Sequence, residues 1–95
     1  MYQKSVCVIG AGYWGKNHIR TLYELGYLGG IVEPNKEKLS RFNERYPDVK
    51  GFVSLDEVLK EGGFLGYTVA TPAESHYKLT KKILEAGKHV LVEKP

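Results

Sequence analysis

Three glycines stand within six residues near the start of the chain, directly after a short apolar run. They are Gly10, Gly12 and Gly15 in the segment GAGYWG, and the apolar run before them covers residues 5–9. Residues 13–25, which follow, repeat apolar side chains at helical spacing. A strand that passes through glycines straight into a helix is typical of α/β proteins with parallel strands.

Short β-prone runs and longer helical patterns alternate along the rest of the chain. Strands are predicted over residues 5–9, 30–33, 50–53, 66–70 and 89–92. Helices with capping residues and glycine or proline stops are predicted over residues 13–25, 35–46, 54–60 and 71–86. Such an alternation predicts a parallel sheet with right-handed crossovers and helices on both faces. The expected fold class is α/β, a doubly wound parallel sheet of about five strands.

Length, composition and charge exclude several other classes. The chain has 95 residues, enough for one small domain, with 42% hydrophobic and 26% charged residues. No apolar stretch approaches the roughly 18–20 residues of a membrane span, and no signal peptide is visible. The single cysteine, Cys7, cannot form an internal disulfide, which favours a reducing, cytoplasmic location.

The net charge of +3 comes from basic residues that the sequence distributes over predicted helix faces. A nucleic-acid-binding surface would gather them into a stripe with interleaved aromatic residues. We therefore expect no nucleic-acid partner and no membrane partner. No pair of histidines or cysteines has metal-ligand spacing, so no metal site is expected.

The glycine segment completes the G-x-G-x-x-G fingerprint of dinucleotide-binding Rossmann domains in its expected context. Gly10 would permit the turn after the strand, Gly12 would let the backbone approach a pyrophosphate, and Gly15 would let the helix lie close to the sheet. The helix N-terminus would direct N–H groups and a partial positive charge at the phosphates. Glu33, at the end of the second predicted strand, would accept hydrogen bonds from the adenosine ribose.

The same acidic residue bears on the choice of cofactor. A carboxylate at this position repels a 2′-phosphate, so NAD is expected rather than NADP, although Lys36 and Lys38 lie close enough to weaken the preference. Tyr13 and Trp14, inside the fingerprint, either pack the start of the helix or contact the cofactor.

Two further motifs follow predicted strands, TPAESH at residues 71–76 and EKP at residues 93–95. Together with the fingerprint, and in this order, they resemble the Gfo/Idh/MocA oxidoreductase family over about residues 5–95. The segment GYWGKNHIR is similar to the branch that acts on nucleotide-linked sugars and sugar acids. The resemblance implies a Rossmann cofactor domain that precedes a C-terminal substrate domain. It also implies hydride transfer between a nicotinamide cofactor and a carbohydrate hydroxyl, in a full-length protein that forms a homo-oligomer.

The resemblance assigns roles to residues near the ends of the last two strands. Lys94 would be the catalytic residue beside the nicotinamide, hydrogen-bonding the reacting oxygen and helping to move its proton. Thr71, Pro72 and His76 would form part of the cofactor wall, although His76 could instead cap the helix or face solvent. Glu93 would orient the ribose or the loop that carries Lys94.

The sequence also departs from the family. Its fourth predicted strand reads GYTV, without the acidic residue and the aliphatic run that are frequent there. Residues 1–95 are expected to hold an incomplete dinucleotide-binding domain that lacks the sixth strand and the substrate domain. The chain alone should then bind dinucleotide weakly, catalyse nothing, and associate through the exposed edge of residues 89–92.

An alternative is a non-catalytic module that senses NAD(H) or binds another nucleotide. The EKP motif favours the enzyme, because a sensor needs no lysine at the hydride-transfer position. Glu33 disfavours a coenzyme A or mononucleotide site, because a free ribose diol explains that acid best.

Overall fold

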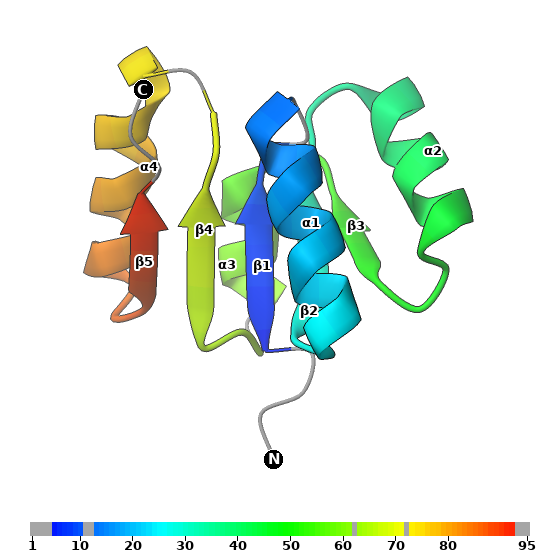
Figure 1. The fold of residues 1–95 in the computed structure, drawn as a ribbon. Coiled ribbons are helices and arrows are strands. Elements are labelled where there is room, and N and C mark those ends of the chain that lie inside the picture. Colours follow the sequence, from blue (N-terminus) through cyan, green and yellow to red (C-terminus); the bar gives the residue numbers. More distant parts are fainter. Residues whose placement is uncertain (1–4, 11–12, 62, 72, 93–95) are drawn as a thin grey trace.

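The computed structural model describes residues 5–10, 13–61, 63–71 and 73–92. Strands and helices alternate through these residues, as the sequence pattern predicts (Figure 1). In chain order the elements are β1 Val6–Ile9, α1 Tyr13–Leu25, β2 Leu28–Val32, α2 Lys36–Arg45, β3 Lys50–Phe52, α3 Leu55–Glu61, β4 Gly66–Val69, α4 Ala73–Glu85 and β5 His89–Val92.

The strands form one parallel sheet in the order β3-β2-β1-β4-β5. This is the order of the first five strands of a doubly wound Rossmann sheet. The chain runs outward from β1 through β2 to β3, and then crosses to β4 on the other side of β1. The predicted fold class is confirmed, and the change of direction falls between β1 and β4.

The second strand begins earlier than the sequence pattern predicts. It starts at Leu28 rather than at Gly30, and it ends at Val32, so Glu33 is the first residue beyond it. Leu28 is buried and pairs with Val6 of β1, whose N–H donates to the carbonyl oxygen of Tyr27 at 3.0 Å. Pairing and burial at this point outweigh the low strand propensity of the glycines that follow.

Two helices begin at the predicted capping residues. The Oδ1 of Asn35 accepts the N–H of Lys38 at 3.1 Å and caps α2. At the start of α3, the Oγ of Ser54 accepts the N–H of Glu57 at 3.2 Å, and the Glu57 carboxylate accepts the N–H of Val53 at 3.3 Å. The predicted capping box is therefore present, with its return bond one residue further back than the usual N-cap N–H.

Helices cover both faces of the sheet, and each pair of helices has its own core. Figure 1 shows α1 in front of the sheet and α3 behind it. The α1/α2 layer packs on the sheet through a buried cluster of Val8, Ile19, Leu28, Ile31, Leu39, Tyr46 and Val49. The opposite layer packs through Cys7, Ile9, Val32, Phe52, Leu55, Val58, Phe64, Tyr67, Val69 and Ile83. Successive residues of β1 alternate between these clusters, as the pleat of a strand requires.

Two leucines within the predicted helices are exposed. Leu25 is 61% exposed at the last position of α1, and Leu84 is 58% exposed beside the fully buried Ile83. Adjacent helical residues point about 100° apart, so Ile83 and Leu84 cannot both face the sheet. Within the described ranges, no helix is both long and apolar enough to cross a membrane.

Candidate functional site

A pocket of about 490 Å³ opens at the carboxyl edge of the sheet, where the ends of β1, β2 and β4 meet. This is the edge at which parallel α/β sheets bind their ligands, beside the point where the strand order reverses. The lining is mostly apolar, with polar side chains from α3, from α4 and from the residues shortly before each of these helices. Its residues are Ile9, Gly10, Val32, Pro34, Val53, Ser54, Leu55, Asp56, Thr71, Lys78, Leu79 and Lys82.

Gly10 occupies a position that admits no side chain. Its φ is +97°, a left-handed conformation that favours glycine. A Cβ added there would stand 2.9 Å from the Cγ2 of Thr71 and 3.1 Å from the carbonyl oxygen of Ala70. The Gly10 N–H donates to the carbonyl oxygen of Val32 at 2.8 Å, which ties the turn to the end of β2. At this turn the pocket is therefore lined by backbone atoms without a side chain.

Gly15 is the point of closest approach between α1 and this turn. A Cβ at Gly15 would overlap the carbonyl oxygen of Gly10 and stand 3.8 Å from the Cβ of Ala70. The close packing predicted for the third fingerprint glycine is therefore present. It places the N-terminal end of α1, whose first N–H groups have no partner within the helix, directly beside the Gly10 turn.

Glu33 lies directly beyond β2 and is only 7% exposed. Its N–H donates to the carbonyl oxygen of Phe52 at 2.9 Å, which fixes its backbone against β3. The carboxylate Oε2 accepts the N–H of Asn35, the residue that caps α2, at 2.8 Å. The predicted ribose-binding acid is therefore oriented by the backbone at the end of its own strand.

An ion pair joins the two helices at the rim of the pocket. Lys82 Nζ of α4 lies 3.0 Å from Asp56 Oδ1 and 3.3 Å from Asp56 Oδ2 of α3. Both side chains are largely exposed, so the pair contributes roughly 0–1 kcal/mol to stability. Its significance is positional, because it sets charged groups at the mouth of an otherwise apolar pocket.

Several predicted site residues lie partly or wholly outside the described part of the chain. Gly12, Pro72, Glu93 and Lys94 are outside the described residues altogether. For Tyr13 and Trp14 at the start of α1, and for His76 in the first turn of α4, the structure describes the helical backbone and not the side chains.

Sequence reasoning missed the apolar wall of the pocket. Val53 follows β3 in the same way that Glu33 follows β2, so its place at the carboxyl edge was available from the strand pattern. Leu79 comes from the middle of α4 and carries no local signal for this role. Among the described residues, no three His, Cys, Asp or Glu side chains come close enough to hold a metal ion.

Strand order, glycine turn and edge pocket together define a Rossmann domain of the dinucleotide-binding class. Residues 4–95 match the family described as "Oxidoreductase family, NAD-binding Rossmann fold", the Gfo/Idh/MocA family. The chain belongs to this family, as the resemblance in its motifs implied.

Several similar proteins are named as dehydrogenases. The UDP-N-acetylglucosamine 3-dehydrogenase of Acidithiobacillus ferrooxidans is 28% identical over 88 residues, covering 93% of this chain and 27% of that protein. An inositol 2-dehydrogenase of Corynebacterium glutamicum is 27% identical over 93 residues, covering 95% of this chain and 28% of that protein. The WlbA dehydrogenase of Bordetella pertussis, whose structure was solved with NADH and UDP-GlcNAcA, superposes on this chain with a TM-score of 0.89 at 29% sequence identity. The match covers 98% of this chain and 30% of that protein. The chain thus spans less than a third of the length of each of these relatives.

Proposed function

We propose that the carboxyl-edge pocket binds NAD, and that this chain is the cofactor-binding part of an enzyme that transfers hydride between nicotinamide and a carbohydrate hydroxyl. The observation that carries the proposal is the bare-backbone turn at Gly10, packed against the start of α1 and set beside the held carboxylate of Glu33. Turn, helix end and acid are the three groups that a dinucleotide needs at this edge.

The described residues fit the cofactor part by part. Gly10 and Gly15 leave room for phosphates at the start of α1, and Gly12 is proposed to do the same between them. Val32 and Val53 offer an apolar wall for an adenine ring. Bound NAD supplies the C4 atom of the nicotinamide, which takes up or gives the hydride.

Glu33 is proposed to accept the hydrogen bonds of the adenosine ribose diol. Its carboxylate is already oriented by Asn35, so little order has to be created on binding. The same negative charge would meet a 2′-phosphate at close range, which supports NAD over NADP.

Lys94 is proposed as the catalytic residue. It follows shortly after the end of β5, the strand next to β4, so its place in the sequence suits the same edge of the sheet. The lysine side chain there would hydrogen-bond the reacting oxygen, giving a proton as the ammonium or taking one as the neutral amine as the hydride moves. Glu93, Thr71, Pro72 and His76 are proposed as neighbours that shape the cofactor site, with Tyr13 and Trp14 at its phosphate end.

The names of the relatives support a sugar, polyol or nucleotide-linked sugar as substrate. Their greater length supports a whole protein with a substrate domain that residues 1–95 do not include, so we expect these residues alone to be inactive. We also propose a homo-oligomer for the full-length protein. A cytoplasmic location is supported by the buried free thiol of Cys7.

The test is calorimetric titration of the chain with NAD, NADH and NADP, beside Gly12→Val and Glu33→Gln. Gly12→Val should abolish binding, because its side chain would fill the space of the pyrophosphate. Glu33→Gln should weaken NAD binding about tenfold and reduce the difference in affinity between NAD and NADP. Glu85→Gln removes an exposed charge from the far end of α4 and should change neither the affinity for NAD nor the preference for NAD over NADP. Failure of a chain with an intact melting transition to bind any of the three would contradict the proposal.

A further inference from the structure

A second concave site lies between α1 and α2, in the helix layer on the other face of the sheet from α3 and α4. It has a volume of about 470 Å³ and no acidic residue in its lining. Five of the lining residues are cationic and two are aromatic. The lining consists of Lys16, Asn17, Arg20, Lys38, Arg41, Phe42, Arg45 and Tyr46, which we call the α1–α2 groove.

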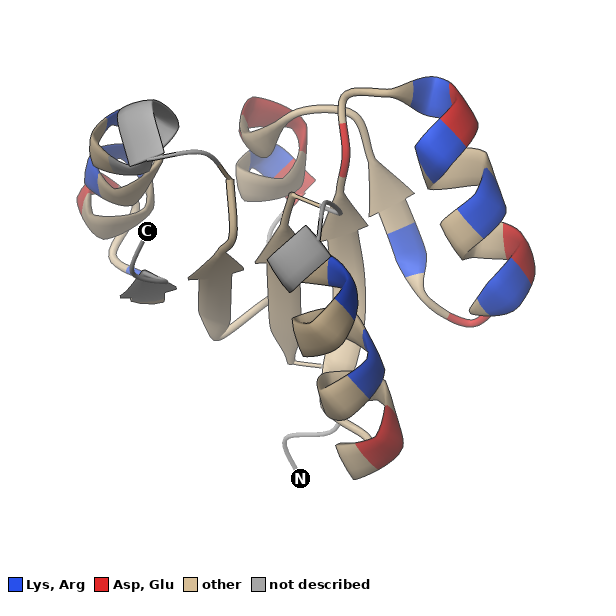
Figure 2. Cartoon of the chain, turned by 45° about the horizontal axis from the view of Figure 1, so that its top comes forward, with Lys and Arg blue, Asp and Glu red and all other residues tan. Residues whose placement is uncertain are grey.

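The fold creates this concentration of charge from residues far apart in the sequence. The basic bands of α1 and of α2 are visible in Figure 2. The groove carries five positive charges, more than the formal net charge of +3 for the whole chain, so the remaining residues are net acidic. The sequence-based expectation of scattered basic residues therefore does not hold for this surface.

Carboxylates within the described ranges neutralise the groove only weakly. Arg41 lies 3.9 Å from Glu37, in a contact where both side chains are at least 75% exposed. For the other four cations, the described part of the chain shows no ion pair within 4.0 Å. The five cations that line the groove together create a positive potential over it, which attracts an anion.

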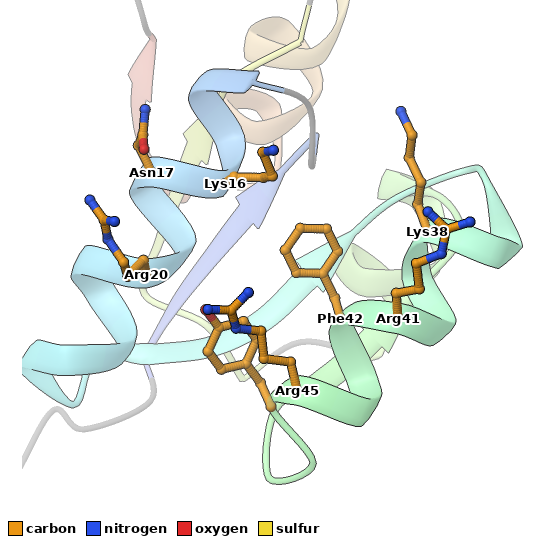
Figure 3. Close-up of a pocket in the computed structure, with 8 residues that line it drawn as sticks. Lys16, Asn17, Arg20, Lys38, Arg41, Phe42 and Arg45 are labelled. Atoms are coloured by element: carbon orange, nitrogen blue, oxygen red, sulfur yellow. The ribbon is translucent and has the colours of Figure 1, made fainter.

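Aromatic rings form the floor of the groove. Phe42 stands between the two helices, with Lys16 on the α1 side and Arg45 on the α2 side (Figure 3). Its ring is nearly parallel to that of Tyr46, at 14° with 6.4 Å between centroids, and the Arg45 guanidinium lies 5.9 Å from the centre of the Tyr46 ring. Phe42 is only half-buried, so part of its surface remains open to a flat ligand.

We propose that the α1–α2 groove binds a nucleoside polyphosphate, with phosphates among the cations and the base against Phe42. Arginine side chains suit phosphate oxygens because their donors are planar and paired. The volume is that of a small-ligand site, which favours a single nucleotide over a long nucleic acid. The α1–α2 groove shares no lining residue with the carboxyl-edge pocket, so the proposal does not depend on NAD binding in that pocket.

The probe is ATP, titrated into the ¹⁵N-labelled chain and followed by amide chemical shifts, with adenosine and inorganic tripolyphosphate in parallel. ATP should shift the amides of α2 around Arg41 and of α1 around Arg20, and it should bind at least about tenfold more tightly than adenosine or tripolyphosphate. Saturating NAD should not displace it. Raising the salt concentration should weaken binding, because the contacts are ionic.

Arg41→Gln/Arg45→Gln is the test variant, and Lys60→Gln/Lys81→Gln is the control that removes two exposed charges from α3 and α4. The first should weaken ATP binding about tenfold or more and leave NAD binding unchanged, while the control should change neither. The proposal would be overturned by amide shifts confined to the carboxyl-edge pocket, by an equal loss of ATP binding in the control, or by tripolyphosphate binding as tightly as ATP. A single-stranded oligonucleotide that binds more tightly than ATP would also overturn it.

Discussion

Single atoms decide whether the β1–α1 turn can form. The missing Cβ of Gly15 matters because the carbonyl oxygen of Gly10 occupies its place, and the missing Cβ of Gly10 matters because Thr71 and Ala70 stand beside it. The first contact joins the start of α1 to the residue after β1, and the second joins that residue to the segment after β4. The fingerprint glycines are therefore packing requirements of the fold as well as proposed features of the cofactor site.

Gly15→Ala should lower the free energy of unfolding by at least about 2 kcal/mol, because the new methyl group would force α1 away from the Gly10 backbone. Gly66→Ala is the matched control, since a Cβ there meets nothing nearer than a carbonyl oxygen at 3.9 Å. We expect the control to stay within about 1 kcal/mol of the parent chain in urea unfolding. Equal stability of the two variants would refute this account of Gly15.

Whole elements were predictable where each one has its own local signal. Asn35 and Ser54 mark the starts of α2 and α3 because capping is a contact between near neighbours in the chain. The early start of β2 at Leu28 was not predictable in this way, because it depends on pairing with Val6. The residues of the candidate site divide in the same way, into those with a local sequence signal and those that only the tertiary fold brings together.

Gly10, Gly15 and Glu33 belong to one local motif that a sequence can display. The contribution of Leu79 to the carboxyl-edge pocket and the contribution of both Arg20 and Arg45 to the α1–α2 groove are products of the tertiary fold. No spacing rule along the chain relates such residues to one another. They become visible only when the helices are placed on the sheet.

Strand β5 is at one edge of the described sheet and presents unpaired backbone groups on its outer side. We expect the chain to self-associate through this edge, so that its sedimentation mass rises with concentration. His89→Lys should reduce the association, because a charge at an exposed edge position opposes strand pairing. Tyr77→Lys places the same charge on the exposed face of α4 and should leave it unchanged. A monomer at all concentrations would contradict the prediction.

The whole molecule is organised around β1, which pairs with β2 on one side and β4 on the other. Cys7 of β1 sits opposite Tyr67 of β4 in the register, and both side chains are buried. Burial raises the pKa of the Cys7 thiol, and burial followed by the nearby Cys7 raises the pKa of the Tyr67 hydroxyl. The centre of the sheet therefore resists deprotonation.

Stability should consequently fall as the pH rises through and above about 9. In that range the unfolded chain releases the Cys7 proton and the folded chain keeps it, so alkali favours unfolding by up to about 1.4 kcal/mol per pH unit. Tyr67 adds to the slope from about pH 10, its unfolded value. Below both unfolded values the two groups contribute no slope.

Urea unfolding between pH 7 and 10.5 measures this dependence. Cys7→Ala should be less stable at pH 7, because a buried side chain is shortened, but its stability should fall less between pH 9 and 10. A slope identical to that of the parent chain would show that Cys7 is not the group responsible.

The central position of β1 also governs the order in which the molecule can be completed during synthesis. Of the described strands β1 is made first and can pair early with β2, but its other neighbour, β4, is made only after α1, β2, α2, β3 and α3. Until then the edge of β1 that faces β4 stays open, and the cluster around Cys7 and Ile9 lacks Tyr67, Val69 and Ile83. A nascent chain stalled before residue 66 should therefore expose an adhesive strand edge, which is a natural binding site for a molecular chaperone.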